Sequence, residues 1–201
     1  MATEAGAYEA IVLAAGAGRR FGGRKLLAPH GRGVLLDAAL GAALAAPVAQ
    51  VTVVTGADGV EVALAAEACA ARFGQLDRLN LVHAEDHEEG MGASLRAAAA
   101  ELAPDSAGVF VFLGDMPRIP PAVFAGLIAA VEAGAPAAAP VFDGKRGHPV
   151  LIGAELIPGL LTLTGDAGAR AVLQGLGERL ALVQTADDGV LFDVDRPGDL
   201  P

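Results

Sequence analysis

Short runs of apolar, partly β-branched residues alternate along the chain with longer stretches in which alanine and leucine recur at helical spacing. The short runs are typical of buried strands and occupy residues 8–14, 51–55, 79–83 and 108–113. The longer stretches predict helices over residues 36–46, 60–73, 93–102 and 121–133. This alternation predicts an α/β fold: a Rossmann-like, mostly parallel sheet with helices on both faces and ligand sites at the carboxyl ends of the strands.

The alternation becomes less regular after Gly134. There the segments "APAAAPVF" and "GHPVLI" flank the loop "DGKRG", so we expect an antiparallel or irregular addition to the sheet. Two helical patterns and two strand candidates follow in this order: "AELIPGLL", "DAGARAVLQGL", "LALVQT" and "VLFDV". No repeat, low-complexity linker or charge block divides the chain, and we therefore expect residues 1–201 to form a single domain.

Composition narrows the class of protein. The sequence is 53% hydrophobic and 19% charged, which is too apolar for a disordered chain. No apolar run reaches the roughly 20 residues of a membrane span, and residues 1–7 lack the features of a signal peptide, so we expect a cytoplasmic protein without membrane contact. A net charge of -10 argues against nucleic acid as a partner, and any anionic ligand needs a local basic patch. The single cysteine, Cys69, is expected to be a buried thiol without chemistry.

A basic patch of this kind follows the first predicted strand, in "LAAGAGRRFGGRK", residues 13–25. Glycine-rich backbone beside four basic side chains suits a polyphosphate ligand at a strand end. The dinucleotide-binding pattern G-x-G-x-x-G fails, because Phe21 stands where the third glycine is required. The P-loop pattern fails as well, because Leu26 replaces the Ser or Thr that must follow the lysine.

The loop does match L-A-A-G-x-G-x-R-x-G-x-x-K, and so resembles the signature of nucleotidyltransferases that transfer a nucleoside monophosphate to a phosphate-bearing acceptor. The chain most resembles the molybdenum cofactor cytidylyltransferases among them. This resemblance implies that the nucleotide is bound by Leu13, Ala14, Ala15, Gly16, Gly18, Arg20, Lys25 and Asp115. It also implies catalytic roles for Arg20, Lys25 and Asp115. The competing interpretation is a solvated glycine-rich turn.

The resemblance extends to a magnesium site. "GDMP" directly follows the strand predicted at residues 108–113, and the family pattern implies that Asp115 binds Mg²⁺. A carboxylate at a strand end suits this ion, which keeps water and phosphate oxygens as its other ligands. "DVDRPGDL" near the end of the chain implies that Asp193 or Asp195 also reaches the metal. The alternative is that Asp115 only caps a turn.

Three further segments match the cytidylyltransferase pattern: "EGMGASL", "GHPVLI" and "TGDAGAR". They imply an acceptor site that contains Ser94, His148, Asp166 and Arg170. The alternative interpretation of His148 is that it only orders its loop. The alternative interpretation of Asp166 is that it caps the helix through Ala169. Relatives often carry Asn and Trp where this chain has Ala84 and His87. The nearby order H-A-E-D-H favours a solvated acidic loop over a zinc site.

The resemblance therefore implies transfer of CMP from CTP to the phosphate of molybdopterin, with a molybdenum-dependent oxidoreductase as the eventual recipient of the product. Cytidine is implied by Ala15, because guanylyltransferases for the same cofactor tend to read L-A-G-G where this chain reads "LAAG". Three alternatives stay open: a nucleotidyltransferase for another phosphorylated acceptor, an NAD-linked oxidoreductase, and a non-catalytic carrier of the cofactor.

Overall fold

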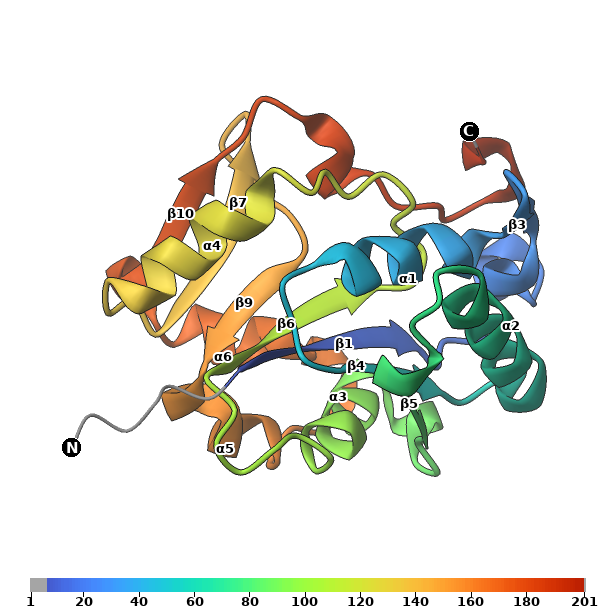
Figure 1. Ribbon diagram of the computed structural model, residues 1–201, viewed down its shortest axis with the longest axis horizontal. Coiled ribbons are helices and arrows are strands. Elements are labelled where there is room, and N and C mark those ends of the chain that lie inside the picture. Colours follow the sequence, from blue (N-terminus) through green and yellow to red (C-terminus); the bar gives the residue numbers. More distant parts are fainter. Residues whose placement is uncertain (1–6, 201) are drawn as a thin grey trace.

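The computed structural model describes residues 7–200, which build an eight-stranded mixed sheet (Figure 1). Along the sheet the order is β10-β7-β9-β6-β1-β4-β5, and β8 pairs with β7 alone. The main strands are β1 (Tyr8–Ala14), β4 (Val51–Thr55), β5 (Leu79–His83), β6 (Gly108–Leu113), β7 (Ala137–Phe142), β8 (Lys145–Arg146), β9 (Val150–Gly153) and β10 (Leu180–Gln184). A separate small hairpin joins β2 (Pro29–His30) to β3 (Gly33–Val34). The pairs around β1 are parallel, whereas β9 runs antiparallel to both of its neighbours, β6 and β7.

Helices cover both faces of the sheet, as the strand–helix alternation predicts. On one face lie α1 (Leu35–Ala45), α2 (Gly59–Arg72) and α4 (Val123–Glu132); on the other lie α3 (Met91–Ala99), α5 (Ile157–Leu160) and α6 (Ala169–Gln174) (Figure 1). Successive side chains of a strand point to opposite faces, so Phe110 and Phe112 pack under the first group while Val109 and Val111 pack under the second. Each face thus has its own apolar core, and both cores leave the strand ends open for a ligand.

The four strands predicted before Gly134 are confirmed, and so is the antiparallel addition after it. The prediction of a strand at "VLFDV" is wrong, because residues Asp188–Leu191 form a 3₁₀ helix. Val190 O accepts from His148 N at 2.8 Å, whereas Val194 N donates to Asp115 O at 3.0 Å. These two bonds join the segment to two different parts of the chain, so it does not pair with any one strand and forms no β-ladder.

Cys69 is buried in the core between α1 and α2. Burial raises the pKa of its thiol to about 11, and the Asp37 carboxylate adds to the rise. The expectation of an inert buried thiol agrees with this environment. Among residues 7–200, no helix has the length and apolar character that crossing a membrane requires.

Candidate active site

The carboxyl ends of β1 and β6 open side by side into a cavity of about 670 Å³. Gly114 N donates to Leu13 O at 3.0 Å, which places Asp115 directly beside the loop that leaves β1. The cavity wall contains seven of the residues predicted to bind the nucleotide: Leu13, Ala15, Gly16, Gly18, Arg20, Lys25 and Asp115. Ala14 is the exception, because its side chain is buried in the core under α1 and α2.

Gly18 allows the loop to fold back on itself. Its φ of 59° lies in the left-handed region, and a Cβ atom there would stand 2.8 Å from the Lys25 Cβ. Two short 3₁₀ turns, Arg19–Phe21 and Lys25–Leu27, complete the return. Leu26 is buried in the core and fixes the end of the loop, so that the neighbouring Lys25 side chain faces the sheet edge.

An ion-pair network of four side chains joins the loop to the strand ends. Lys25 Nζ donates to Asp115 Oδ2 at 2.5 Å and lies 4.0 Å from Asp195 Oδ1. Arg20 Nη1 donates to the other oxygen of Asp195, Oδ2, at 2.9 Å. The Lys25 side chain is 13% exposed and that of Asp115 is 23% exposed, so this pair is shielded from water, whereas Arg20 lies open to solvent.

The C-terminal segment brings further carboxylates to this edge. Val194 is buried and its backbone bonds to Asp115, which leaves Asp193 and Asp195 on either side of an anchored residue. Partial burial raises the pKa of Asp193, and the negative charges of Asp115 and then Asp195 raise it further. The structure therefore gathers negative charge from two distant parts of the sequence at one strand end.

A divalent cation fits the donor chemistry of this edge. Asp115, Asp193 and Asp195 offer carboxylate oxygens, the donors that Mg²⁺ prefers. In the described part of the chain, no three His, Cys, Asp or Glu side chains are arranged as a ready-made metal cage. A cation bound here would therefore complete its shell with water and with the phosphate oxygens of a nucleotide, as Mg²⁺ does at many nucleotide sites.

The start of α3 forms the opposite wall of the larger cavity. Ser94 is only 4% exposed and lines the larger cavity together with the loop after β1. The prediction that Ser94 shares one site with His148 and Arg170 is wrong, because those two residues line the smaller cavity. The glycines of "EGMG" let another segment approach closely: a Cβ atom on Gly92 would stand 2.8 Å from Gly165 O. Two of the segments that match the cytidylyltransferase pattern therefore pack backbone to backbone.

A second cavity of about 330 Å³ adjoins the first and shares four wall residues with it: Leu13, Met91, Leu113 and Asp166. His148, Asp166 and Arg170, three of the predicted acceptor residues, line this smaller cavity. Asp166 belongs to a separate turn, Gly165–Ala167, and Gly168 precedes α6, so the alternative role of Asp166 as a helix cap is wrong. Most of the remaining wall is apolar.

His148 both orders its loop and faces the smaller cavity. Its Nδ1 lies 3.4 Å from Val111 O, and because a carbonyl oxygen only accepts, this nitrogen carries the proton of the neutral ring. Burial lowers the pKa of His148, although the Val111 carbonyl and the Asp115 charge oppose the shift. A neutral His148 leaves Nε2 as a hydrogen-bond acceptor toward a ligand.

Arg146 and His87 are two polar wall residues that were absent from the set predicted from the sequence. Arg146 lies in β8 and lines the smaller cavity, only two residues before His148. His87 lines the larger cavity, in a 3₁₀ turn that follows β5. The sequence offered one signal for each, the basic loop "DGKRG" and the unusual residue at position 87, but neither signal gave a position in space.

The fold, the loop and the carboxylates agree with one known family. A family model for the MobA-like NTP transferase domain matches residues 10–183. The chain belongs to this family. The matched range includes the loop after β1, Asp115 and the segments that line the smaller cavity, whereas Asp193 and Asp195 lie beyond it.

The proteins to which the chain is similar carry different names. The chain is 25% identical to the molybdenum cofactor cytidylyltransferase of Escherichia coli (strain K12), over 96% of this chain and 93% of that protein. It is 33% identical to the nicotine blue oxidoreductase of Paenarthrobacter nicotinovorans, over 92% of this chain and 90% of that protein. The crystal structure of Rv0371c from Mycobacterium tuberculosis H37Rv superposes with a TM-score of 0.83 at 29% identity and covers 98% of this chain and 96% of its own. The same protein in complex with manganese superposes with a TM-score of 0.74 at 25% identity, over 90% of this chain and 89% of its own.

Proposed function

We propose that this member of the MobA-like NTP transferase family moves CMP from CTP to the phosphate of a molybdopterin-type acceptor and releases pyrophosphate. The observation that carries the proposal is the ion-pair network at the ends of β1 and β6, where Lys25 and Arg20 meet Asp115 and Asp195. Phosphoryl-group transfer needs two kinds of charged side chain at one place: cations that bind the phosphates and carboxylates that bind a metal ion. The name of the E. coli relative supports this acceptor.

In the proposed reaction, a phosphate oxygen of the acceptor forms a bond to the α-phosphorus of CTP. The bond from that phosphorus to the oxygen that bridges to the β-phosphorus breaks, and pyrophosphate leaves with the electron pair. Lys25 and Arg20 hold the phosphate oxygens and compensate the charge on the leaving group. Asp115 and either Asp193 or Asp195 would hold Mg²⁺, which would add positive charge beside the same phosphates. The manganese complex of Rv0371c supports a divalent ion in this fold.

The smaller cavity supports an acceptor with an apolar body and polar edges. Neutral His148 offers a hydrogen-bond acceptor, whereas Arg146 and Arg170 offer donors and positive charge. The cavity adjoins the one that contains the ion-pair network, so an acceptor seated there has its phosphate close to the nucleotide. The product would pass to a molybdenum-dependent oxidoreductase.

An oxidoreductase is the second candidate, favoured by the 33% identity to nicotine blue oxidoreductase. Against it, Phe21 replaces the third glycine of the dinucleotide fingerprint in the loop after β1. Consumption of NADH or NADPH in the presence of nicotine blue, measured without CTP, would favour this second candidate over the first.

Pyrophosphate release from CTP, GTP, ATP and UTP, each with and without molybdopterin, tests the proposal. Release from CTP that depends on the acceptor is the expected result. Binding of both ligands without release would indicate a carrier, and release that depends only on another phosphorylated compound would indicate a different acceptor. Either result overturns the proposal.

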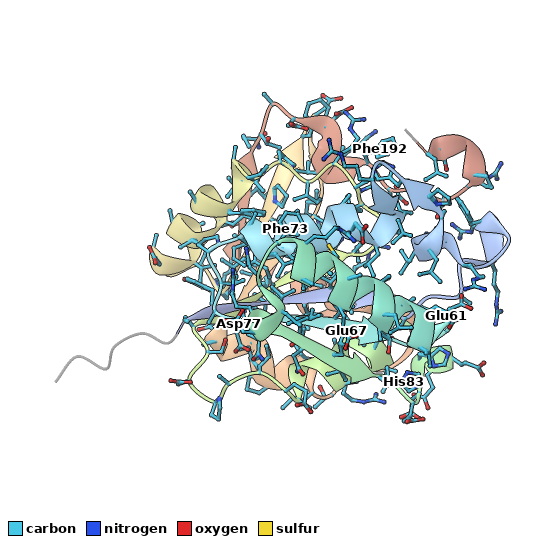
Figure 2. All side chains as sticks on the ribbon, turned by 45° about the vertical axis from the view of Figure 1, so that its right-hand side comes forward. Glu61, Glu67, Phe73, Asp77, His83 and Phe192 are labelled. Carbon is cyan, nitrogen blue, oxygen red and sulfur yellow. The ribbon has the colours of Figure 1, made fainter. Side chains whose placement is uncertain are left out.

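The metal assignment is tested by Asp115→Asn, which removes a charge without changing the size of the side chain. We expect the rate to fall by about 100-fold, the scale of losing one electrostatic contact in a transition state. Asp77→Asn is the matched control, because Asp77 is exposed near the end of α2, away from the cavity walls (Figure 2). A folded Asp115→Asn variant that works at the wild-type rate would show that Asp115 does not hold the metal.

A further inference from the structure

The larger cavity has a charged end and a nearly uncharged end. The sheet order β6-β1-β4-β5 sets its direction: Asp115 follows β6, the basic loop follows β1, and His87 lies in the turn after β5. Arg20, Lys25 and the carboxylates stand at the β6 side. At the β4 and β5 side the wall is formed by Ala15, Ala57, His87, Ser94 and the exposed Glu88. If the triphosphate occupies the charged end, its base reaches the other end, beside His87.

The His87 ring is fixed in one orientation. Its Nδ1 lies 3.0 Å from Ala84 O, which is an acceptor, so Nδ1 carries the proton of the neutral ring and Nε2 carries the lone pair. The side chain packs against the backbone at Gly56, where an added Cβ atom would stand 2.6 Å from His87 Cγ and 2.8 Å from Ala15 O. His87 and the Ala15 carbonyl therefore lie against the same glycine.

A base at this end meets a hydrogen-bond acceptor whose own position is set by the protein. Cytosine carries an amino group, a donor, at the position where uracil carries a carbonyl oxygen. A lone pair facing an amino group gains a hydrogen bond, whereas a lone pair facing a carbonyl oxygen leaves two acceptors unpaired. A cavity wall of this kind distinguishes the two pyrimidines by chemistry, since their sizes are equal.

We infer that His87 is a specificity-determining residue of the nucleotide site and that its Nε2 accepts a hydrogen bond from the amino group of the base. The inference rests on the proposed function, because it requires a nucleoside triphosphate in the larger cavity. It adds the reason that CTP is preferred over UTP, which the size of Ala15 cannot supply. One neutral hydrogen bond corresponds to a preference of about 10-fold.

The experiment measures the dissociation constants of CTP and UTP by isothermal titration calorimetry, with the full chain and without an acceptor. Wild-type protein is expected to prefer CTP by about 10-fold. His87→Phe keeps a ring of similar shape without its nitrogens, and should bind CTP about 10-fold more weakly while UTP binding does not weaken. His83→Phe is the matched control: His83 is exposed and is the last residue of β5, and its ring lies 6.0 Å from that of His87 between centroids (Figure 2). This control should keep the preference for CTP.

A ligand lacking the amino group tests the same contact without any substitution. The triphosphate of 2-pyrimidinone riboside is CTP without its 4-amino group, and wild-type protein should bind it about 10-fold more weakly than CTP. Equal binding of these two ligands, or a CTP preference that survives in His87→Phe, would overturn the inference while leaving the proposed function intact. Wild-type protein that binds no nucleoside triphosphate would overturn both.

Discussion

Lys25→Met removes the positive charge at the centre of the ion-pair network and keeps the length of the side chain. Lys25 Nζ lies 2.5 Å from Asp115 Oδ2 in a place where both side chains are mostly shielded from water. Two opposite unit charges 4 Å apart attract by about 4 kcal/mol at an effective dielectric constant near 20, and breaking a fully buried pair costs about 3 to 5 kcal/mol. Because Asp115 regains part of its hydration, we expect the free energy of unfolding to fall by about 2 kcal/mol.

Although Lys25→Met should destabilise the fold, it should strengthen the binding of a divalent ion. The Lys25 ammonium group lies against Asp115 Oδ2 and 4.0 Å from Asp195 Oδ1, two of the carboxylate oxygens available to a cation. Without this competitor, Mn²⁺ should bind about 10-fold more tightly in the absence of nucleotide, since 1.4 kcal/mol of relieved competition corresponds to that factor. Triphosphate binding should weaken, because a phosphate-binding charge is lost.

The assays are chemical denaturation and titration of free Mn²⁺ by electron paramagnetic resonance. Lys145→Met is the control, because Lys145 is an exposed lysine of β8 outside both cavities. A Lys25→Met protein with wild-type stability would show that the ion pair contributes nothing to folding. Unchanged or weaker Mn²⁺ binding would refute the competition between the ammonium group and the metal.

Two further predictions concern Ala15 and His148. Ala15→Gly should raise the ratio of GTP to CTP specificity constants without inverting it, because one methyl group alters discrimination by only about 1 to 3 kcal/mol; an unchanged ratio would mean that Ala15 does not select the base. Burial lowers the pKa of His148 below 6.5 in the folded protein, so the unfolded chain binds the proton first as the pH falls. The free energy of unfolding should therefore decrease below about pH 6.5, and His148→Gln should reduce this decrease in denaturation curves measured at pH 7.5 and pH 5.5; equal pH dependence in both proteins would contradict the assignment.

The parallel part of the sheet was predictable because its strands are short and apolar and are separated by helices long enough to cross over. The start of α3 was predicted less accurately: the helix begins at Met91, two residues before the predicted start. A glycine at its second position is unfavourable by local propensity. A Cβ atom at position 92 would collide with the backbone at Thr164 and Gly165, so this contact requires a glycine, and no local pattern contains that contact.

The charged end of the larger cavity was predictable because its residues are close together in the sequence or stand directly after a predicted strand. Its loop is one continuous segment with a fixed spacing of glycine, arginine and lysine, and Asp115 stands directly after a strand that neighbours β1. The assignment of Ser94, in contrast, depended on which of two adjoining cavities the first turn of α3 faces. That choice is set by the packing of α3 against the segment at Gly165, which is 71 residues away from Ser94 in the sequence, as 165 minus 94 shows.

The two cavities depend on each other because one pair of segments separates them. Met91 and Asp166 line both cavities, and each belongs to one of the segments that meet at Gly92 and Gly165. Gly168 lies next to Met91 Sδ, and its φ of 49° is in the left-handed region that favours glycine. A wall built from close backbone contacts has little freedom to move on one side alone. A change in the larger cavity, where we propose that the nucleotide binds, should therefore also alter the smaller cavity, where we propose that the acceptor binds.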